Sequence, residues 1–421
     1  MQLITYKNLR ISGVEYKHIL ELRIYQKICE HANAFIKLET EPDKAQSFLE
    51  HITERDIVHI YANENVIYAG LVKDTSISYF ENNAHLNLSL VSTSKALDCI
   101  YESHSYQNVG VAFSDIMRKT VAGVGIVETH FNDKKTEGIM IQYQETDWGF
   151  VRRLALDCSS FIVPDIISDT PKIIVGPNPT TSDLIEYAGN VKEGNCIVEV
   201  NTEMKNGILV TETHTEKVSK IQSAIPAIYK GNPVAGKIFS GIVEKVEGDK
   251  LQAHIADIDA EYEEGNWWFP YSTIYSSPTN LAGIYTMPKD KETVRLFFPS
   301  ENSADAFAAS SSNTRENGAD SKEKVFTSPM GMGVKFYNDG LMIYCDGKTV
   351  YIDLKKNGEI LLNSNKQISF IAKNGMMLSP SENLKVTSEK EIYVGTKQSF
   401  IDLNAKNGGT VDIYSQKIFV K

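Results

Sequence analysis

A repeated alternation of apolar and polar residues runs from residue 350 to the end of the chain. Side chains at every second position of a strand share a face, so each alternating run predicts a short strand with one apolar face. Asn-Gly pairs between the runs supply the positive φ that tight turns require. Runs centred about every eight residues are typical of an all-β repeat. The alternating apolar residues are Val350, Ile352 and Leu354, Ile360 and Leu362, Ile368, Phe370 and Ala372, Leu384 and Val386, Ile392 and Val394, Ile401 and Leu403, Val411 and Ile413, and Ile418 and Val420.

The apolar face of each run is only two or three side chains wide, and no amphipathic helix lies nearby to cover it. A lone hairpin of this kind is marginal in water, so the faces must be buried against one another. A monomeric sandwich or β-helix would achieve this, and so would an intertwined oligomer with its apolar stripes on a shared axis. The narrow stripe favours the oligomer, because it fills a three-sided prism and intertwining removes open strand edges. We therefore expect a trimeric β-prism (a β-helix) over residues 325–421.

Residues 1–228 contain mostly strand patterns and two helix patterns. Asn63 and Asn65 lie between two apolar runs and tolerate a tight turn, which predicts a hairpin. Apolar residues at helical spacing predict a helix near residues 109–122. A second helix is expected near residues 147–158, with Thr146 as its N-cap and Asp147 in its first turn. The fold class is therefore mainly β with a few helices.

Residues 229–299 form several short alternating runs, which are typical of a small closed barrel. The aromatic residues Trp267, Trp268, Phe269 and Tyr271 are interpreted as barrel core and as packing against a neighbouring domain. Residues 300–324 are small and polar, so this segment is expected to be a linker or a surface loop.

Motifs for catalysis or ligand binding are weak. The stretch at 231–238 nearly matches a phosphate-binding loop, but Ile238 replaces the Mg²⁺-binding hydroxyl and no helix pattern follows. The acidic stretch at 257–265 fits a calcium loop poorly and is interpreted as a solvated loop. The nine His residues are scattered singly, and no Cys pair has metal-ligand spacing. Acidic pairs leave glycosidase chemistry open, but none is distinguished. We expect no catalytic, metal-binding or cofactor-binding residues and no cofactor.

Charge and cysteine content restrict the partners and the compartment. The formal net charge of −11 argues against a nucleic-acid partner. Five dispersed Cys residues fit a reducing cytosol, and an odd number excludes complete pairing within one chain. The first residues show no signal-peptide pattern, and no apolar run is long enough to span a membrane. We expect synthesis in the cytoplasm and export by a route other than ordinary secretion.

The order of these parts resembles the hub–spike proteins of contractile injection machines, namely VgrG proteins, phage late control protein D and the spikes of phage-like particles. Residues 142–165 resemble the hub segment of that family, in which an aromatic residue after Thr-Asp begins a helix that leads into a strand. Residues 236–255, 267–272 and 293–302 resemble its OB-fold barrel, and residues 325–360 resemble the entry to its trimeric prism.

The resemblance implies a homotrimer with a tube-binding hub at 1–228, an OB-fold barrel at 229–299 and a needle at 325–421. It implies that the hub caps the inner tube at the baseplate centre and that sheath contraction drives the needle into a target envelope. Implied partners are the tube and baseplate proteins, a separate PAAR-type tip protein and a non-covalent cargo, with assembly in the cytoplasm and export within the particle.

The sequence departs from some members of that family. Residues 300–324 are too few for a lysozyme domain between barrel and prism, and the needle ends without the His residues of a metal-binding tip. The expectation is a structural protein and not an enzyme. A tail-associated cell-wall hydrolase and a trimeric receptor-binding fibre are the alternatives.

Overall fold

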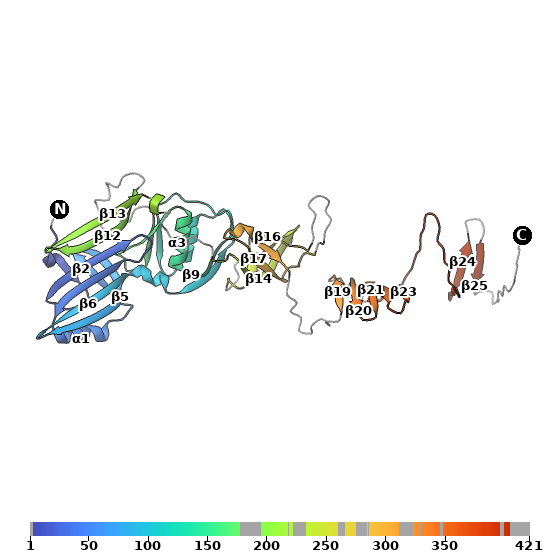
Figure 1. Cartoon of the computed structure of the whole chain (residues 1–421), viewed down its shortest axis with the longest axis horizontal. Coiled ribbons are helices and arrows are strands. Elements are labelled where there is room, and N and C mark those ends of the chain that lie inside the picture. Colours follow the sequence, from blue (N-terminus) through green and yellow to red (C-terminus); the bar gives the residue numbers. More distant parts are fainter. Residues whose placement is uncertain are drawn as a thin grey trace. The chain divides into compact units, whose positions relative to one another are not determined.

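The computed structural model describes residues 3–176, 195–217, 219–221, 233–259, 266–274, 284, 286–310, 323–328, 330–345, 348–395 and 400–404. The chain divides into two compact units, Met1–Thr314 and Arg315–Lys421. The first unit contains a large sheet, a mixed layer with two helices and a small barrel, and the second contains short antiparallel strands (Figure 1).

An eight-stranded sheet with the order β1-β4-β5-β6-β3-β2-β12-β13 begins the first unit. Alternation places Leu86 and Leu88 inside it with no exposed surface. The Leu209 amide donates to the Ile4 carbonyl at 2.9 Å, which joins the two edges so that the sheet nearly closes. The strands are β1 (Leu9–Ile11), β2 (His18–Lys27), β3 (Asn33–Thr40), β4 (Ile57–Ala62), β5 (Asn65–Phe80), β6 (Asn83–Ser92), β12 (Asn195–Lys205) and β13 (Ile208–Lys217).

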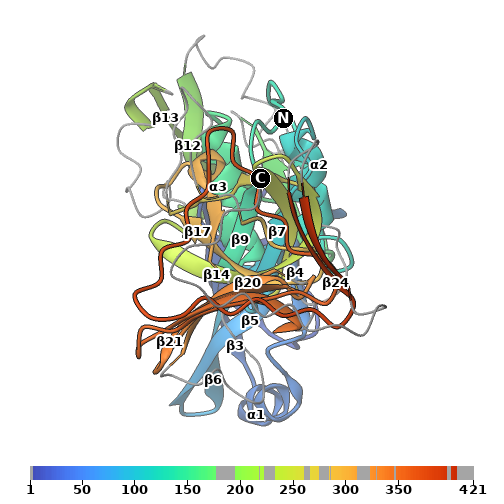
Figure 2. The ribbon, with the colours of Figure 1, turned by 90° about the vertical axis from the view of Figure 1, so that its right-hand side faces the viewer.

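A helix that the sequence analysis did not predict, α1 (Pro42–His51), lies beside β5 and β6 (Figure 2). Only Ala45 and Phe48 of this helix are buried, so its apolar stripe is too sparse to predict a helix. Its start is signalled by Pro42, whose fixed φ suits a first helical position. A 3₁₀ turn, η1 (Tyr6–Asn8), precedes β1.

The mixed layer contains both predicted helices. They are shorter than expected, at Phe113–Thr120 for α2 and Asp147–Asp157 for α3. The Thr146 hydroxyl accepts from the Gly149 amide at 3.1 Å, which confirms the expected N-cap. Trp148 and its helical neighbours fill the core of this layer. Its other elements are η2 (Thr93–Asp98), β7 (Tyr101–Tyr106), β8 (Ile126–Thr129), β9 (Met140–Thr146), β10 (Ile162–Pro164) and β11 (Lys172–Val175).

The barrel has the strand order β16-β15-β14-β17-β18. A bridge between Tyr271 and Ala308 joins the two edge strands, and the Ser272 amide donates to the Ala308 carbonyl at 2.7 Å. Ala306 and Ala308 are buried in the barrel core, so the barrel continues beyond the expected boundary at residue 299. The small side chains that suggested a linker here are the ones that fit this core. The elements are β14 (Lys237–Glu247), β15 (Lys250–Ile255), β16 (Trp268–Pro270), β17 (Thr293–Phe298), η5 (Ser303–Asp305) and β18 (Phe307–Ala309).

Buried contacts attach the barrel to the mixed layer. The Asp259 carboxylate, 5% exposed, accepts from the Ser105 amide and from the Ser105 hydroxyl, each at 2.7 Å. Ile139 and Ile141, which lie on the hub side, are part of the barrel core. The interpretation of the acidic stretch as a solvated loop is therefore wrong for Asp259, while residues 260–265 lie outside the described residues.

The second unit contains a five-stranded antiparallel meander, in which each strand pairs with the next along the chain, and a separate hairpin. Its strands are β19 (Lys324–Thr327), β20 (Gly333–Tyr337), β21 (Gly340–Cys345), β22 (Val350–Lys355), β23 (Ile360–Asn363), β24 (Glu391–Gly395) and β25 (Phe400–Asn404). The strand expected at 368–372 and the one expected at 384–386 do not form, because residues 364–390 have no strand partner among the described residues. Those expected at 411–413 and 418–420 lie outside the described residues, as do residues 311–322 of the expected linker.

A hydrogen bond joins two strands on one face of the meander. The Tyr337 hydroxyl donates to Asp353 Oδ1 at 2.6 Å, and Asp353 is only 4% exposed. This hydrogen bond to a carboxylate, with burial and the negative charge of Asp353 adding to it, raises the pKa of Tyr337 to about 12.

We predict that Asp259→Ala lowers the free energy of unfolding of the first unit by about 2–3 kcal/mol, because it leaves two buried donors of Ser105 unpaired. Urea unfolding of the full chain measures the change. The exposed neighbour Asp257 is the matched control, and Asp257→Ala is expected to cost less. Equal losses for the two variants would contradict the assigned role of Asp259.

We predict that Tyr337→Phe destabilises the meander at neutral pH and that this deficit disappears in alkali. A raised pKa in the fold means that the stabilisation is complete below the unfolded value of 10 and is lost as the pH rises through about 12. The urea midpoints of wild type and variant, measured from pH 8 to 12, should converge. Tyr351→Phe, on β22, is the control, and a gap that stays constant with pH would be inconsistent with this account.

Candidate functional site: an uncovered apolar sheet face

Apolar side chains cover one face of the meander. Phe326, Val334, Ile343, Ile352 and Leu362 are direct cross-strand partners, one from each strand from β19 to β23. They form one continuous row across the whole sheet, which we call the central apolar row. Neighbouring side chains in such a row lie about 4.5–5.5 Å apart at Cβ, so they form a single apolar strip.

A second row lies two residues away on the same face. Phe336, Leu341, Leu354 and Ile360 are cross-strand partners in β20 to β23, and Lys324 completes the row at the edge strand β19. Because side chains two positions apart share a face, these residues extend the strip made by the central apolar row. The face is therefore at least two apolar residues wide from β20 to β23, and the central apolar row extends it to β19.

This face is exposed in the single chain. Phe326 is 64% exposed and Ile352, at the centre, is 42% exposed. Isolated exposed apolar side chains are ordinary, but a contiguous strip of this size indicates an interaction surface. Full burial of one Ile, Leu or Phe side chain contributes about 1.5–3 kcal/mol, so covering the strip would stabilise the unit considerably.

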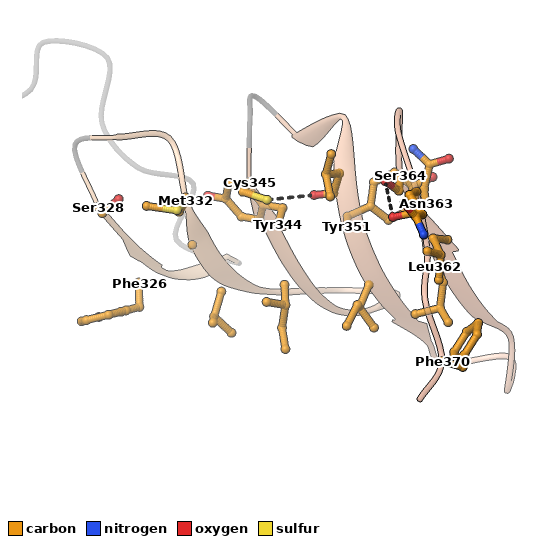
Figure 3. A pocket seen from close by; sticks show the side chains of 17 residues that line it. Phe326, Ser328, Met332, Tyr344, Cys345, Tyr351, Leu362, Asn363, Ser364 and Phe370 are labelled. Carbon is orange, nitrogen blue, oxygen red and sulfur yellow. Dashed lines mark hydrogen bonds between the residues drawn. The ribbon is translucent and has the colours of Figure 1, made fainter. Parts of the chain in front are cut away.

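The opposite face has a different character. Tyr344 and Asp353 are buried there, and Lys335 forms an ion pair with Glu323. Figure 3 shows Phe326, Leu362 and Phe370 on one side of the ribbon, away from Tyr344 and Tyr351. The two faces therefore differ chemically. The face with Asp353 and Lys335 contains hydrogen bonds and ion pairs within the sheet, whereas the face with the central apolar row has no covering layer in the single chain.

A groove of about 760 Å³ runs along the apolar face. Its lining includes the central apolar row and, from the segment that follows β23, Ile368 and Phe370 (Figure 3). The segment continues without strands to residue 390. Its apolar side chains are largely exposed; Ile371, for example, is 95% exposed and Met377 is 85% exposed. An extended segment with exposed apolar side chains and unpaired backbone groups is incomplete as a folded element.

The hub contains polar clusters that the sequence analysis did not predict. His31, Ser94 and Asp98 are hydrogen-bonded in a Ser-His-Asp order, with 2.9 Å between His31 Nδ1 and Ser94 Oγ and 3.3 Å between His31 Nε2 and Asp98 Oδ2. Ser94 has no exposed surface, so no substrate can reach its hydroxyl. Residues separated by more than 60 positions make this cluster, and no local motif indicates it.

The phosphate-loop-like stretch leads into a strand. Strand β14 begins at Lys237, within this stretch, whereas a phosphate-binding loop requires a helix there. Phe269 is fully buried in the barrel core, Trp267 and Tyr271 pack against that core, and the Trp267 amide donates to Gln107 Oε1 at 3.2 Å. The interpretation as barrel core is thus confirmed for these three residues, while Trp268 is not part of the core. Residues 231–232 lie outside the described part.

Within the described part of the chain, no group of three or more His, Cys, Asp or Glu residues could hold a metal ion. No helix among the described residues is both long and apolar enough to cross a bilayer. The expectation of a chain without catalytic or metal-binding residues stays a prediction. The candidate functional surface is therefore the apolar face of the meander.

No protein-family model matches the chain, and no curated protein matches it in sequence. Solved structures do. Chains of the Francisella PdpA–VgrG complex, in half-lidded and lidded forms, match with 9% identity and a TM-score of 0.50, covering 86% of this chain and 88% and 80% of theirs. An E. coli type VI secretion component, similar to the T4 bacteriophage tail proteins gp27 and gp5, covers 72% of this chain and 99% of its own at 12% identity and a TM-score of 0.46. This chain has the mainly β fold of a VgrG-like hub and spike.

Proposed function

We propose that this chain is the structural hub and membrane-piercing spike of a contractile injection apparatus, and that it works as a homotrimer. The observation that carries the proposal is the uncovered apolar face of the meander. Three identical sheets turned inward would bury three copies of the central apolar row at one axis, and the polar face with Asp353 would point to solvent.

Trimer formation also accounts for the segment at 364–390. Its backbone has no strand partner in the part of the chain that the structure describes, and its apolar side chains are exposed. In an intertwined prism the neighbouring chains supply both the strand partners and the apolar cover. Closely packed strand ladders on every side would make the shaft stiff, which suits a part that is pushed through an envelope.

The first unit supplies a firm base for this shaft. The buried Asp259–Ser105 contact and the shared core at Ile139 and Ile141 fix the barrel to the hub. A base whose parts are joined by buried hydrogen bonds and by shared close packing deforms little under load. In our proposal this base caps the inner tube at the centre of the baseplate.

The proposed partners follow from this position. They are the tube and baseplate proteins, a PAAR-type protein on the tip and a non-covalent cargo. A solved complex of similar fold unites VgrG with PdpA, which supports the association of such a spike with a further protein. The chain would be assembled in the cytoplasm and leave within the particle, and its role would be structural, without catalysis.

We predict that Ile352→Asp prevents trimer assembly, because it places three unpaired charges at one level of the buried axis, at a cost of several kcal/mol. The matched control is Thr327→Asp, which adds the same charge on the opposite face, where Thr327 is exposed. Sedimentation velocity of the purified full chain measures the mass. We expect trimers for wild type and for Thr327→Asp, and monomers for Ile352→Asp.

Particle function provides the second measurement. In a strain that lacks the native chain, Thr327→Asp should restore sheath-bearing particles that injure target cells, and Ile352→Asp should not. A monomeric wild type would refute the proposal, and so would normal trimers of Ile352→Asp. If a monomeric variant restored the injury of target cells, the function would not require the trimeric prism, and the proposal would be wrong.

A further inference from the structure

His31 lies where three elements of the hub meet. It follows β2, and it contacts η2 through Ser94 and Asp98 and α3 through Trp148, with ring centroids 4.1 Å apart. Asp98 extends the connection, because its Oδ1 accepts from the Thr146 hydroxyl at 2.7 Å and Thr146 caps α3. One imidazole thus connects the β2–β3 turn, η2 and the start of α3.

A chain of hydrogen bonds fixes the direction of every proton around this imidazole. The Ala32 amide can only donate, and it donates to Ser92 Oγ at 3.2 Å. Ser92 Oγ lies 2.8 Å from Ser94 Oγ, and Ser94 Oγ lies 2.9 Å from His31 Nδ1. Among the described residues, Ser94 Oγ is the one acceptor within reach of the Ser92 hydroxyl, so the network is fully satisfied only when Ser92 donates to Ser94 and Ser94 donates to His31 Nδ1.

The other ring nitrogen completes the assignment. Asp98 is an acceptor, because it also receives Lys95 Nζ at 2.9 Å and the Thr146 hydroxyl. His31 Nε2 must therefore carry the proton that it donates to Asp98. The network is complete with neutral His31 in this one tautomer.

Protonation of His31 would reverse the chain. Nδ1 would become a donor to Ser94, the Ser94 hydroxyl would turn to Ser92, and the Ser92 proton would lose its acceptor, since the described residues offer the Ser92 hydroxyl no other hydrogen bond. Ser92 and Ser94 have no exposed surface, so water cannot satisfy the displaced proton. A buried donor without a partner costs free energy.

The charges that face His31 are those of Asp98 and Lys95 on η2 and Arg152 on α3. Burial lowers the pKa of His31 below its ordinary 6.5, and Lys95 and Arg152 add to this effect while Asp98 opposes it. Burial also opposes ionisation of Asp98, yet the hydrogen bonds from His31, Lys95 and Thr146 hold the pKa of Asp98 well below its usual range.

We propose that His31 is an acid-sensitive lock, which holds the β2–β3 turn against η2 and the start of α3 while it is neutral and releases them when it takes up a proton. The sign follows from the fold. Because the folded state binds this proton less readily than the opened state, the stabilisation is complete above pH 6.5 and is lost as the pH falls from there through the lower folded value. An acidic environment therefore loosens the hub locally and leaves the large sheet intact.

Hydrogen–deuterium exchange of the full chain tests the lock. Exchange is measured from pH 7.5 to 5.0 with labelling times scaled to the intrinsic exchange rate. We expect peptides that contain residues 28–34, 92–99 and 146–150 to lose protection reversibly, with a midpoint below pH 6.5. Peptides from the interior of β6 should keep their protection.

His31→Gln, which keeps a donor and an acceptor but cannot be charged, should abolish the acid-induced loss in these peptides. The control is His104→Gln at a half-exposed histidine of β7, which should behave like wild type. An equal loss in His31→Gln would overturn the proposal. If that variant does not fold, the wild type decides alone. The absence of any loss of protection in these peptides between pH 7.5 and 5.0 also overturns the proposal.

Discussion

An antiparallel sheet with one bare apolar face is the constraint on which the second unit depends. The central apolar row runs without interruption through five strands, and every member except Val334 is at least 42% exposed in the single chain. Water penalises such a strip in proportion to its area. The opposite face of the same sheet cannot cover this strip, because its side chains point away from it and make hydrogen bonds and ion pairs of their own. The chain therefore needs a cover of matching shape, and a symmetric oligomer of the same sheet is the simplest source.

In the first unit, carboxylates hold neighbouring elements together by accepting hydrogen bonds from several of them. Asp259 joins the barrel to the hub through Ser105, and Asp98 joins η2 to the cap of α3 and to His31. Asp259 is buried and Asp98 is partly buried, and each accepts hydrogen bonds from its neighbours, which compensate its charge. Such clusters resemble catalytic groups in composition, but the burial of Ser94 and Ser105 gives them a structural role. The acid-sensitive lock depends instead on the burial of Ser92 and Ser94 beside His31, which Asp98 offsets only in part.

Local patterns predicted the elements whose stability is mainly local. The apolar stripe and the Thr146 cap indicated α3, and the turn signal at Asn63 indicated the β4–β5 hairpin, where Asn63 has a φ of 55°. Helix α1 was missed because its buried stripe consists of two residues. The end of the barrel was placed too early, because small residues that fill a narrow core have the same composition as a linker.

The sequence by itself determined which residues of β22 and β23 share an apolar face, where α3 begins and that short strands follow a small barrel, because these depend on residues close together in the chain. Only the tertiary structure decided that Asp259 is a buried acceptor between the barrel and the mixed layer, that His31 lies between Ser94 and Asp98, and that the five side chains of the central apolar row fall into one register. Ser105 and Asp259 are 154 positions apart, and His31 and Asp98 are 67 apart. Contacts over such distances are set by how whole elements pack, and a local pattern carries no record of that packing.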